Sequence, residues 1–355
     1  MSVLIPAWNA EATLGACLRS LLRQRESRWE CVVVDDGSQD STGSVARAFA
    51  ARDERLRVIA TPHRGIVEAL RVGLEQCRAP FVARMDADDW MHRERLGLQL
   101  AALQAAPELC AVGCHVRLFP RGPREQSAKE RAAPGAGRSA SKPRVEGTAR
   151  RGRAAYEAWL NDIRGPEDLR REALVECPVA HPSLFMRREV LDRFPYRDLG
   201  WPEDYDLVLR LLGAGESIGI VPRRLIGWRD DAGRLSRSAP SYTIERFTAC
   251  KAAHLASSFL AESAQYILWG YGDTGRALRK ALAEHRRHPS HIVELHPGRL
   301  GQRIHGAPVV PPDAIPTLPR QPLIASVAGS GPRGQIRSAL DRMGFVETVD
   351  YFCAA

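Results

Sequence analysis

The sequence of 355 residues lacks a run of apolar residues long enough to cross a membrane. A membrane-spanning helix needs about 20 such residues in succession. Residues 1–5 lead directly into a strand-like segment, without the basic start and long apolar stretch of a secretory signal peptide. These absences predict a cytoplasmic protein, and they leave open a peripheral position at the inner face of a membrane.

The spacing of the cysteines follows no metal-binding pattern. The eight cysteines are scattered, mostly inside apolar segments. Because no export signal is visible, we expect buried, reduced thiols rather than disulfides. Cys110 and Cys114 are close in sequence, but no second Cys/His pair follows at the spacing of a zinc site.

Aromatic residues are missing from the most basic part of the chain. The formal net charge is +9, and residues 117–153, with 11 basic and 3 acidic side chains, account for +8 of it. No aromatic residue between positions 121 and 153 offers a base-stacking surface, so we expect no nucleic-acid partner. The Pro/Gly/Ala/Ser-rich composition predicts a linker or disordered loop over 121–153, within a flexible, solvated insertion over 117–155. Contact of this insertion with anionic lipid or an acidic acceptor is the alternative.

The first hundred residues alternate between strand and helix patterns. Short apolar runs at 2–6, 29–34, 56–60 and 80–85 are separated by helical periodicity at 11–23, 41–52 and 66–76. Such alternation indicates βαβ units and a parallel sheet of the α/β class.

Three of these predicted strands end in polar residues. The segments that follow them are 6–9, 35–38 and 86–89, the last of which contains Asp86, Asp88 and Asp89. Ligands of open parallel sheets bind beyond the carboxyl ends of the strands, so we expect the three segments to converge on one edge. Neighbouring carboxylates repel one another unless they are solvated or neutralised by a cation, and Mg²⁺ or Mn²⁺ suits oxygen ligands. An acidic surface turn is the alternative interpretation.

The three segments also resemble a known family. Residues 2–11 (SVLIPAWNAE), 32–38 (VVVDDGS) and 83–89 (ARMDADD) are similar, in order and spacing, to family-2 glycosyltransferases of the GT-A fold. The likeness extends over about the first 255 residues apart from the basic insertion. It implies a mixed, mostly parallel sheet flanked by helices, with a nucleotide-sugar half over 1–116 and an acceptor half over 156–255.

The resemblance implies roles for individual residues. Asp36 would accept a hydrogen bond from the base, uracil being the commonest in this family, and Trp8 stands where the family more often has Tyr. Asp86 and Asp88 would form the metal site, with Asp88 as the direct ligand. The remaining donor-binding positions would be Pro6, Ala7, Asn9 and Arg84.

Inverting transfer requires a general base, which the resemblance places in the acceptor half. Residues 201–211 (WPEDYDLVLRL) look like the Glu-Asp motif of the family, which implies that Asp204 is the base and that Glu203 orients the acceptor. A helix cap at Asp204 is the alternative. The resemblance implies that His181 would contact the acceptor or a phosphate, and a structural histidine is the alternative. Arginines within 228–237 would clamp the diphosphate from a mobile loop, or are solvated loop charges.

Membrane helices are absent from the sequence, and so is the Gln-x-x-Arg-Trp signature of processive synthases. We therefore expect a single-addition hexosyltransferase that uses Mg²⁺ or Mn²⁺. Its partners would be a nucleotide-sugar donor and a glycan or lipid-linked acceptor of surface glycan biosynthesis.

Residues 262–355 predict a further, Rossmann-like α/β domain. The Gly-rich turn at 270–275 (GYGDTG) follows a strand and opens a helix, and Glu294 ends the next strand. This context is that of a dinucleotide-binding fingerprint. It supports an alternative function, an NAD-dependent oxidoreductase or a nucleotide-sugar-modifying enzyme, although no catalytic partner set is visible nearby. A scaffold or regulatory role for this domain is also open.

Overall fold

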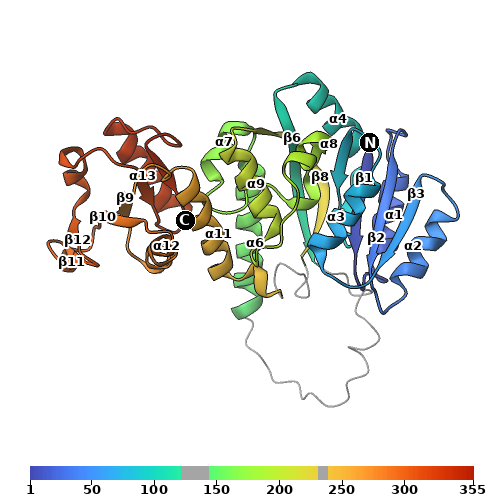
Figure 1. Ribbon diagram of the computed structural model, residues 1–355, viewed down its shortest axis with the longest axis horizontal. Helices are drawn as coiled ribbons and strands as arrows, with labels where there is room; N and C mark the ends of the chain where they lie inside the picture. The colour runs from blue at the N-terminus through green and yellow to red at the C-terminus, as the bar shows by residue number, and fades with distance from the viewer. Residues whose placement is uncertain (121–143, 231–238) are drawn as a thin grey trace, which may run out of the picture. The chain divides into compact units, whose positions relative to one another are not determined.

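A computed structural model describes residues 1–120, 144–230 and 239–355 (Figure 1). The chain divides into two compact units, which are described separately. The first unit comprises Met1–Pro166, Val179–Asp198 and Glu216–Arg234, and the second comprises Glu167–Pro178, Leu199–Gly215 and Leu235–Ala355.

The first unit is built on an eight-stranded mixed sheet in the order β3-β2-β1-β4-β7-β6-β8-β5. Its strands are β1 Ser2–Ala7, β2 Glu30–Asp36, β3 Leu56–Thr61, β4 Phe81–Arg84, β5 Trp90–Met91, β6 Leu109–Pro120, β7 Phe185–Arg187 and β8 Ser217–Asp230. Its helices are α1 Leu14–Leu22, α2 Thr42–Ala50, α3 Ile66–Gln76, α4 Arg95–Ala105, α6 Arg144–Asp162, η2 His181–Ser183 and α8 Arg188–Arg193.

The predicted βαβ alternation at the N-terminus is confirmed. β1 pairs in parallel with β2 and β4, and β2 pairs in parallel with β3. Every residue of β1 is buried, and β2 is buried from Cys31 onward, as expected of parallel strands covered on both faces. α3 packs on β1 and β2. The second half of the sheet is mixed, because β7 runs antiparallel to both β4 and β6.

The prediction of an irregular segment over 121–153 is wrong for residues 144–153, which begin α6. Residues 117–120 of the predicted insertion likewise continue β6. Residues 121–143 lie outside the described residues. The helix is held by contacts that no local pattern announces: the Asn161 side chain bonds both the N–H and the C=O of Val116, at 2.8 and 2.9 Å, and Glu157 accepts from the N–H of Leu118.

The second unit contains helices and a six-stranded sheet in the order β11-β12-β10-β9-β13-β14. Its helical segments are α7 Pro166–Glu172, α9 Glu203–Gly213, η3 Pro240–Tyr242, α11 Ile244–Ser257, α12 Asp273–Glu284, η4 Pro297–Arg299, η5 Pro312–Thr317 and α13 Ser330–Arg342. Its strands are β9 Gln265–Trp269, β10 His288–Val293, β11 Arg303–Ile304, β12 Ala307–Val310, β13 Leu323–Ala325 and β14 Tyr351–Cys353.

Five strands of this second sheet are parallel, and only β11 is antiparallel. In the parallel order β12-β10-β9-β13-β14, the first strand in sequence, β9, lies in the middle. Later strands are added first on one side of β9 and then on the other, as in doubly wound folds. A second α/β sheet is therefore present at the C-terminus.

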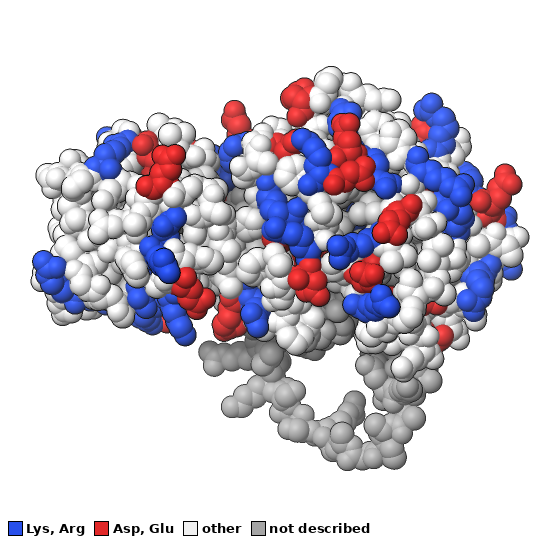
Figure 2. Space-filling model, in the orientation of Figure 1, with Lys and Arg blue, Asp and Glu red and all other residues white. Residues whose placement is uncertain are grey.

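All eight cysteine positions fall among the described residues and each holds a buried thiol, which confirms the prediction. Basic and acidic side chains are interspersed on the face drawn in Figure 2. Within the described parts of the chain, no helix combines the length and the apolar character needed to cross a membrane.

Candidate active site

The strands β1, β2 and β4 are parallel neighbours, so the segments that follow them emerge at the same edge of the sheet. Pro6 and Ala7 are buried at the end of β1, and the exposed Trp8 and Asn9 follow them. This is the edge at which parallel sheets bind ligands.

Three carboxylates gather in the turn after β4. One carboxylate oxygen from each of Asp86, Asp88 and Asp89 lies within 4.8 Å of the others. Mg²⁺ and Mn²⁺ prefer oxygen ligands of this kind, so the donor set of the turn fits either ion. Arg84, a buried arginine at the end of β4, forms an ion pair with Asp86. The arginine offsets part of the repulsion among the carboxylates.

The negative charge of this acidic turn affects a buried neighbour. Cys17 of α1 donates a weak hydrogen bond to the Asp86 carbonyl, at 3.3 Å. Burial, with the charges of Asp89, Asp88 and Asp86 adding to it, raises the pKa of the Cys17 thiol well above its usual value. The thiol therefore stays protonated and neutral beneath the carboxylates.

Two arginines hold the acidic turn in place, a role that the sequence did not predict for either. Arg229 of β8 donates from its backbone N–H to Asp89 and from Nε to the Asp88 carbonyl, both at 2.7 Å. Arg95 of α4 is fully buried and donates to the Arg84 carbonyl at 2.8 Å, and its pKa is lowered to about 10 mainly by desolvation. These contacts anchor both ends of the turn to the sheet and to α4.

The prediction that Trp228 and Arg229 belong to a mobile loop is wrong. Both residues lie in β8, and Arg229 is buried and stacks on the Phe119 ring at 4.9 Å. A strand residue held in this way supports the turn and cannot swing onto a diphosphate. Arg234 and Arg237 lie outside the described residues.

The turn after β2 requires a glycine. Gly37 has φ +65°, and a Cβ there would lie 2.5 Å from the backbone nitrogen of His63. The left-handed backbone and the close approach both exclude a side chain. Ser38 donates its N–H to Asp35 at 3.1 Å and thereby closes the turn.

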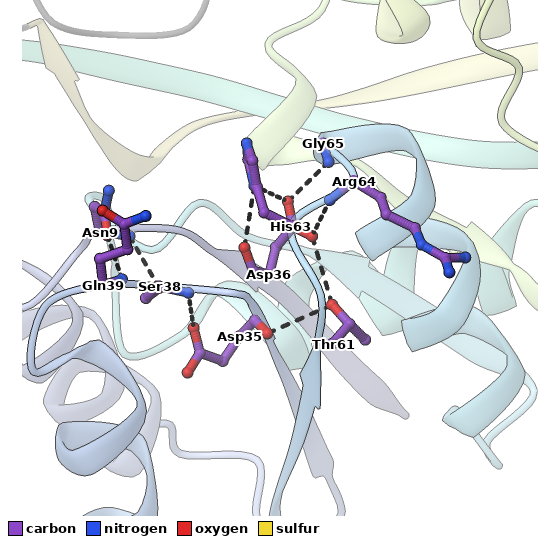
Figure 3. A network of polar contacts seen from close by, with 9 residues as sticks. All are labelled: Asn9, Asp35, Asp36, Ser38, Gln39, Thr61, His63, Arg64 and Gly65. Atoms are coloured by element: carbon purple, nitrogen blue, oxygen red, sulfur yellow. Dashed lines mark hydrogen bonds and ion pairs between the residues drawn. The ribbon is translucent and has the colours of Figure 1, made fainter.

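Asp36 is the hub of a polar network between β2 and the segment after β3 (Figure 3). Its buried carboxylate accepts hydrogen bonds from the N–H groups of Arg64 and Gly65, both at 2.9 Å, and lies 2.8 Å from Nδ1 of His63. The bond to the nucleotide base that the resemblance implies stays a prediction. A base N–H would have to share the carboxylate with these donors or replace one of them.

Asn9 and Trp8 complete this edge. Asn9 takes a left-handed backbone, with φ +48°, and its side chain accepts from the N–H of Gln39 at 2.9 Å. Trp8 is 46% exposed and stacks on His63 with ring centroids 4.5 Å apart. The sequence did not identify His63, and its only signal is its place directly after the third predicted strand.

His181 is buried in η2 and bonds the hydroxyl of Tyr196 at 2.7 Å. Desolvation, with Arg84 nearby, lowers its pKa well below the usual value. A neutral, buried imidazole with a side-chain partner fits the structural alternative for this residue.

The predicted catalytic acids lie in the second unit, in the first turn of α9. Glu203 is 2% exposed, and the hydroxyl of Tyr242 lies 2.8 Å from both of its carboxylate oxygens. Asp204 is half-buried and accepts from the N–H of Tyr205 at 2.8 Å. The residue at the N-cap position is Pro202, without a side-chain capping bond, so the geometry does not favour a cap at Asp204.

Asp206, two residues after Asp204 on α9, is fully buried. It accepts from Nε of Arg210 at 2.8 Å and lies 3.2 Å from Nε2 of His254. This carboxylate is therefore committed to packing α9 against α11.

In the glycine-rich turn after β9, the acidic residue of the predicted dinucleotide site already accepts hydrogen bonds from the protein. Gly270 has φ +96°, and a Cβ at Gly275 would lie 2.1 Å from the Gly270 carbonyl, so both glycines are structural. Glu294 accepts from the N–H of Tyr271 and from Arg299, both at 2.8 Å. In a dinucleotide site the Glu294 carboxylate would face the ribose and the Tyr271 N–H the phosphate, but here the N–H donates to the carboxylate.

Several similar proteins are named as glycosyltransferases. The chain is 35% identical over 91 residues to the uncharacterized glycosyltransferase EpsJ of Bacillus subtilis, a match that covers 26% of each protein. It is 30% identical over 104 residues to WfgD of Escherichia coli, described as a UDP-Glc:α-D-GlcNAc-diphosphoundecaprenol β-1,3-glucosyltransferase, which covers 29% of this chain and 40% of that protein. The match thus spans well under half of the length of either relative.

A solved structure has the same fold. The crystal structure of residues 1–349 of S. aureus TarS in complex with UDP-GlcNAc superposes with a TM-score of 0.53 at 18% identity, covering 80% of this chain and 72% of that one. At this identity the likeness concerns the fold, and it agrees with the predicted mixed sheet flanked by helices. The family model of glycosyl transferase family 2 matches residues 2–194, and the chain therefore belongs to that family.

Proposed function

We propose that the protein is a metal-dependent, inverting glycosyltransferase that moves a hexose from a UDP-sugar to an acceptor hydroxyl. The observation that carries the proposal is the acidic turn of Asp86, Asp88 and Asp89 at the edge where β1, β2 and β4 end. A divalent cation held by these carboxylates would stabilise the charge that builds on the diphosphate as its bond to the sugar breaks.

The chain's own residues supply the other requirements. Asn9, the Trp8–His63 stack and the turn around Asp36 form a surface of aromatic and polar groups suited to a nucleoside. Asp204 would take the proton of the attacking hydroxyl. Glu203, held by Tyr242, would orient the acceptor or the helix turn that carries the base.

The donor and the acceptor are proposed from similar proteins. TarS has been crystallised with UDP-GlcNAc, and WfgD is named for a UDP-glucose donor and a lipid-linked acceptor. A UDP-sugar donor and a lipid-linked or glycan acceptor of surface glycan biosynthesis follow by analogy. The proposed enzyme would then act in the cytoplasm, at the membrane face where such a lipid presents its sugar.

A donor-hydrolysis screen tests the proposal. The full chain is incubated with a panel of nucleotide sugars and Mg²⁺ or Mn²⁺, and release of free sugar is measured. We expect hydrolysis of at least one UDP-sugar that stops in excess chelator and in Asp88→Ala. Asp192→Ala, which removes an exposed acid paired with Arg188, is the matched control and should keep full activity. Turnover that persists in excess chelator, or in Asp88→Ala, would contradict the metal role.

The alternative, an NAD-dependent oxidoreductase or a nucleotide-sugar-modifying enzyme, is less favoured, because Glu294 and the Tyr271 N–H are bonded to each other. Stoichiometric NAD binding that Gly272→Val abolishes would revive it.

A further inference from the structure

A second cluster of metal-ligating side chains lies within the second unit, apart from the acidic turn. It consists of Asp206 on α9 with Cys250 and His254 on α11, and one ligand atom of each lies within 4.8 Å of the others. Cys250 and His254 are four residues apart on one helix, so both face α9. Asp206 and Cys250 are fully buried, and the His254 side chain is 14% exposed.

The spacing of these atoms is close to that of a tetrahedral site. Zinc binds nitrogen and oxygen at about 2.0–2.2 Å and sulfur at about 2.3 Å, so its ligand atoms lie roughly 3.3–3.6 Å apart. Nε2 of His254 is 3.2 Å from Oδ1 of Asp206, which is near that edge length. The sulfur of Cys250 lies within 4.8 Å of both atoms, so it needs to approach them by roughly 1 Å or less.

We propose that Asp206, Cys250 and His254 form a binding site for a thiophilic divalent cation of the zinc class. The ligand set decides the class of ion. Thiolate and imidazole select Zn²⁺ over Mg²⁺ and Mn²⁺, whereas the three carboxylates of the acidic turn select the harder ions. The chain thus carries two sites of different chemistry, each within its own compact unit.

Two further donors hold the Asp206 carboxylate in place. Arg210 donates to the other oxygen of Asp206 at 2.8 Å, and Trp201 donates to Oδ1 at 3.3 Å. Binding replaces the His254–Asp206 hydrogen bond and releases the thiol proton of Cys250 to solvent. The carboxylate and the thiolate together offset the two positive charges of the ion, and Arg210, which holds Asp206 as an outer-shell partner, leaves one positive charge beside the site.

The site would join α9 to α11. Glu203 and Asp204 lie in the first turn of α9, directly before Asp206. A cation bound between the helices would fix that turn, and in this consequence alone the inference rests on the proposed function. The role is one of positioning, since none of the three ligands is assigned to the transfer step.

Cobalt spectroscopy of the full chain tests the site. Protein stripped with a chelator is titrated with Co²⁺, because a thiolate ligand gives Co²⁺ a near-ultraviolet charge-transfer band that carboxylate ligands do not. We expect the band to saturate at one equivalent and to disappear when Zn²⁺ is added. It should be lost in Cys250→Ser and in His254→Gln, in which the amide can still bond Asp206 but is a poor metal ligand.

Two controls separate this site from the rest of the protein. Cys353→Ser removes another buried thiol of the same unit and should keep the band. Asp88→Ala should abolish transfer and keep the band, so failure of the proposed function and failure of this inference are distinguishable. Absence of the band in the wild type, or its persistence in folded His254→Gln, would overturn the inference and leave the triad as an ion-pair contact between the helices.

Discussion

Replacing Asp204 by Asn tests the assignment of the general base more directly than any other change. Asn has nearly the same shape as Asp and cannot accept a proton at neutral pH. Loss of a general base costs about 10²–10⁴ in rate, which corresponds to roughly 2.7–5.4 kcal/mol of transition-state stabilisation. Donor affinity should persist, because the proposed donor residues lie in the first unit and Asp204 in the second.

The structure also sets the expected cost in stability. Asp204 is half-buried in the first turn of α9, and the N-cap position is occupied by Pro202, so no side-chain cap is lost. Asn keeps an oxygen that can accept from the N–H of Tyr205, and loss of the charge next to the helix dipole costs about 0.3–1 kcal/mol. For a chain of this size that corresponds to a shift in melting temperature of at most about 4 °C.

The neighbouring acids provide the comparison. Asp206→Asn should be strongly destabilising, because it weakens a buried ion pair with Arg210, a class of change that costs up to about 3–5 kcal/mol. Glu203→Gln keeps an oxygen that can accept from Tyr242 and should be intermediate in both properties. The assay measures turnover at saturating donor, UDP affinity and melting temperature for all three variants. Turnover of Asp204→Asn within a few-fold of wild type would refute the reasoning.

Three further predictions concern other parts of the molecule. Asp86→Asn should reduce the affinity for Mn²⁺ and the rate together, measured by metal titration of donor hydrolysis; a rate independent of metal concentration would contradict the role of the acidic turn. Gly37→Ala should lower stability by about 1–3 kcal/mol and weaken UDP binding, because the added Cβ would lie 2.5 Å from the backbone nitrogen of His63 in a left-handed turn. The control Gly97→Ala, within α4, should be neutral or stabilising. Equal melting temperatures for the two variants would show that the turn tolerates a side chain. Burial lowers the pKa of Lys251 to about 8, so the unfolded chain, with the ordinary value of 10.5, binds this proton more tightly. The free energy of unfolding should therefore rise between about pH 8 and 10.5, by up to about 3 kcal/mol. Lys251→Met should flatten this rise when the melting temperature is measured against pH.

Local patterns were sufficient for the donor half of the protein. Short buried runs bounded by polar turns predict β1, β2 and β4, because parallel strands that are covered on both faces must be apolar throughout. The order of such strands also predicts that Asn9, Asp36 and Asp88 emerge at one edge, as the pairing of the strands supports. The glycine-rich turn after β9 is predictable for the same reason, since the backbone conformation at Gly270 is local.

Long-range contacts decided the rest. β6 and β8 were not predicted, because these long strands pair with each other across about a hundred residues and mix apolar with charged positions. The beginning of α6 was missed because residues 144–153 show no sustained apolar period, and the contacts that hold the helix to β6 come from Glu157 and Asn161 near its other end. Arg229 became a support of the acidic turn, and Glu294 became the partner of Tyr271, only through the packing of strands and loops.

The sequence by itself determined the family, the parallel sheet and the types of residue at its ligand-binding edge, since each depends on neighbours within a few positions. The tertiary structure alone decided which acids are available. Asp204 and Asp206 differ by two positions in a sequence of similar character, yet one is half-buried and the other is enclosed by Arg210, Trp201 and His254. Likewise, Asp206 meets Cys250 and His254 only because α9 packs on α11, and no spacing along the chain encodes a contact between helices so far apart in sequence.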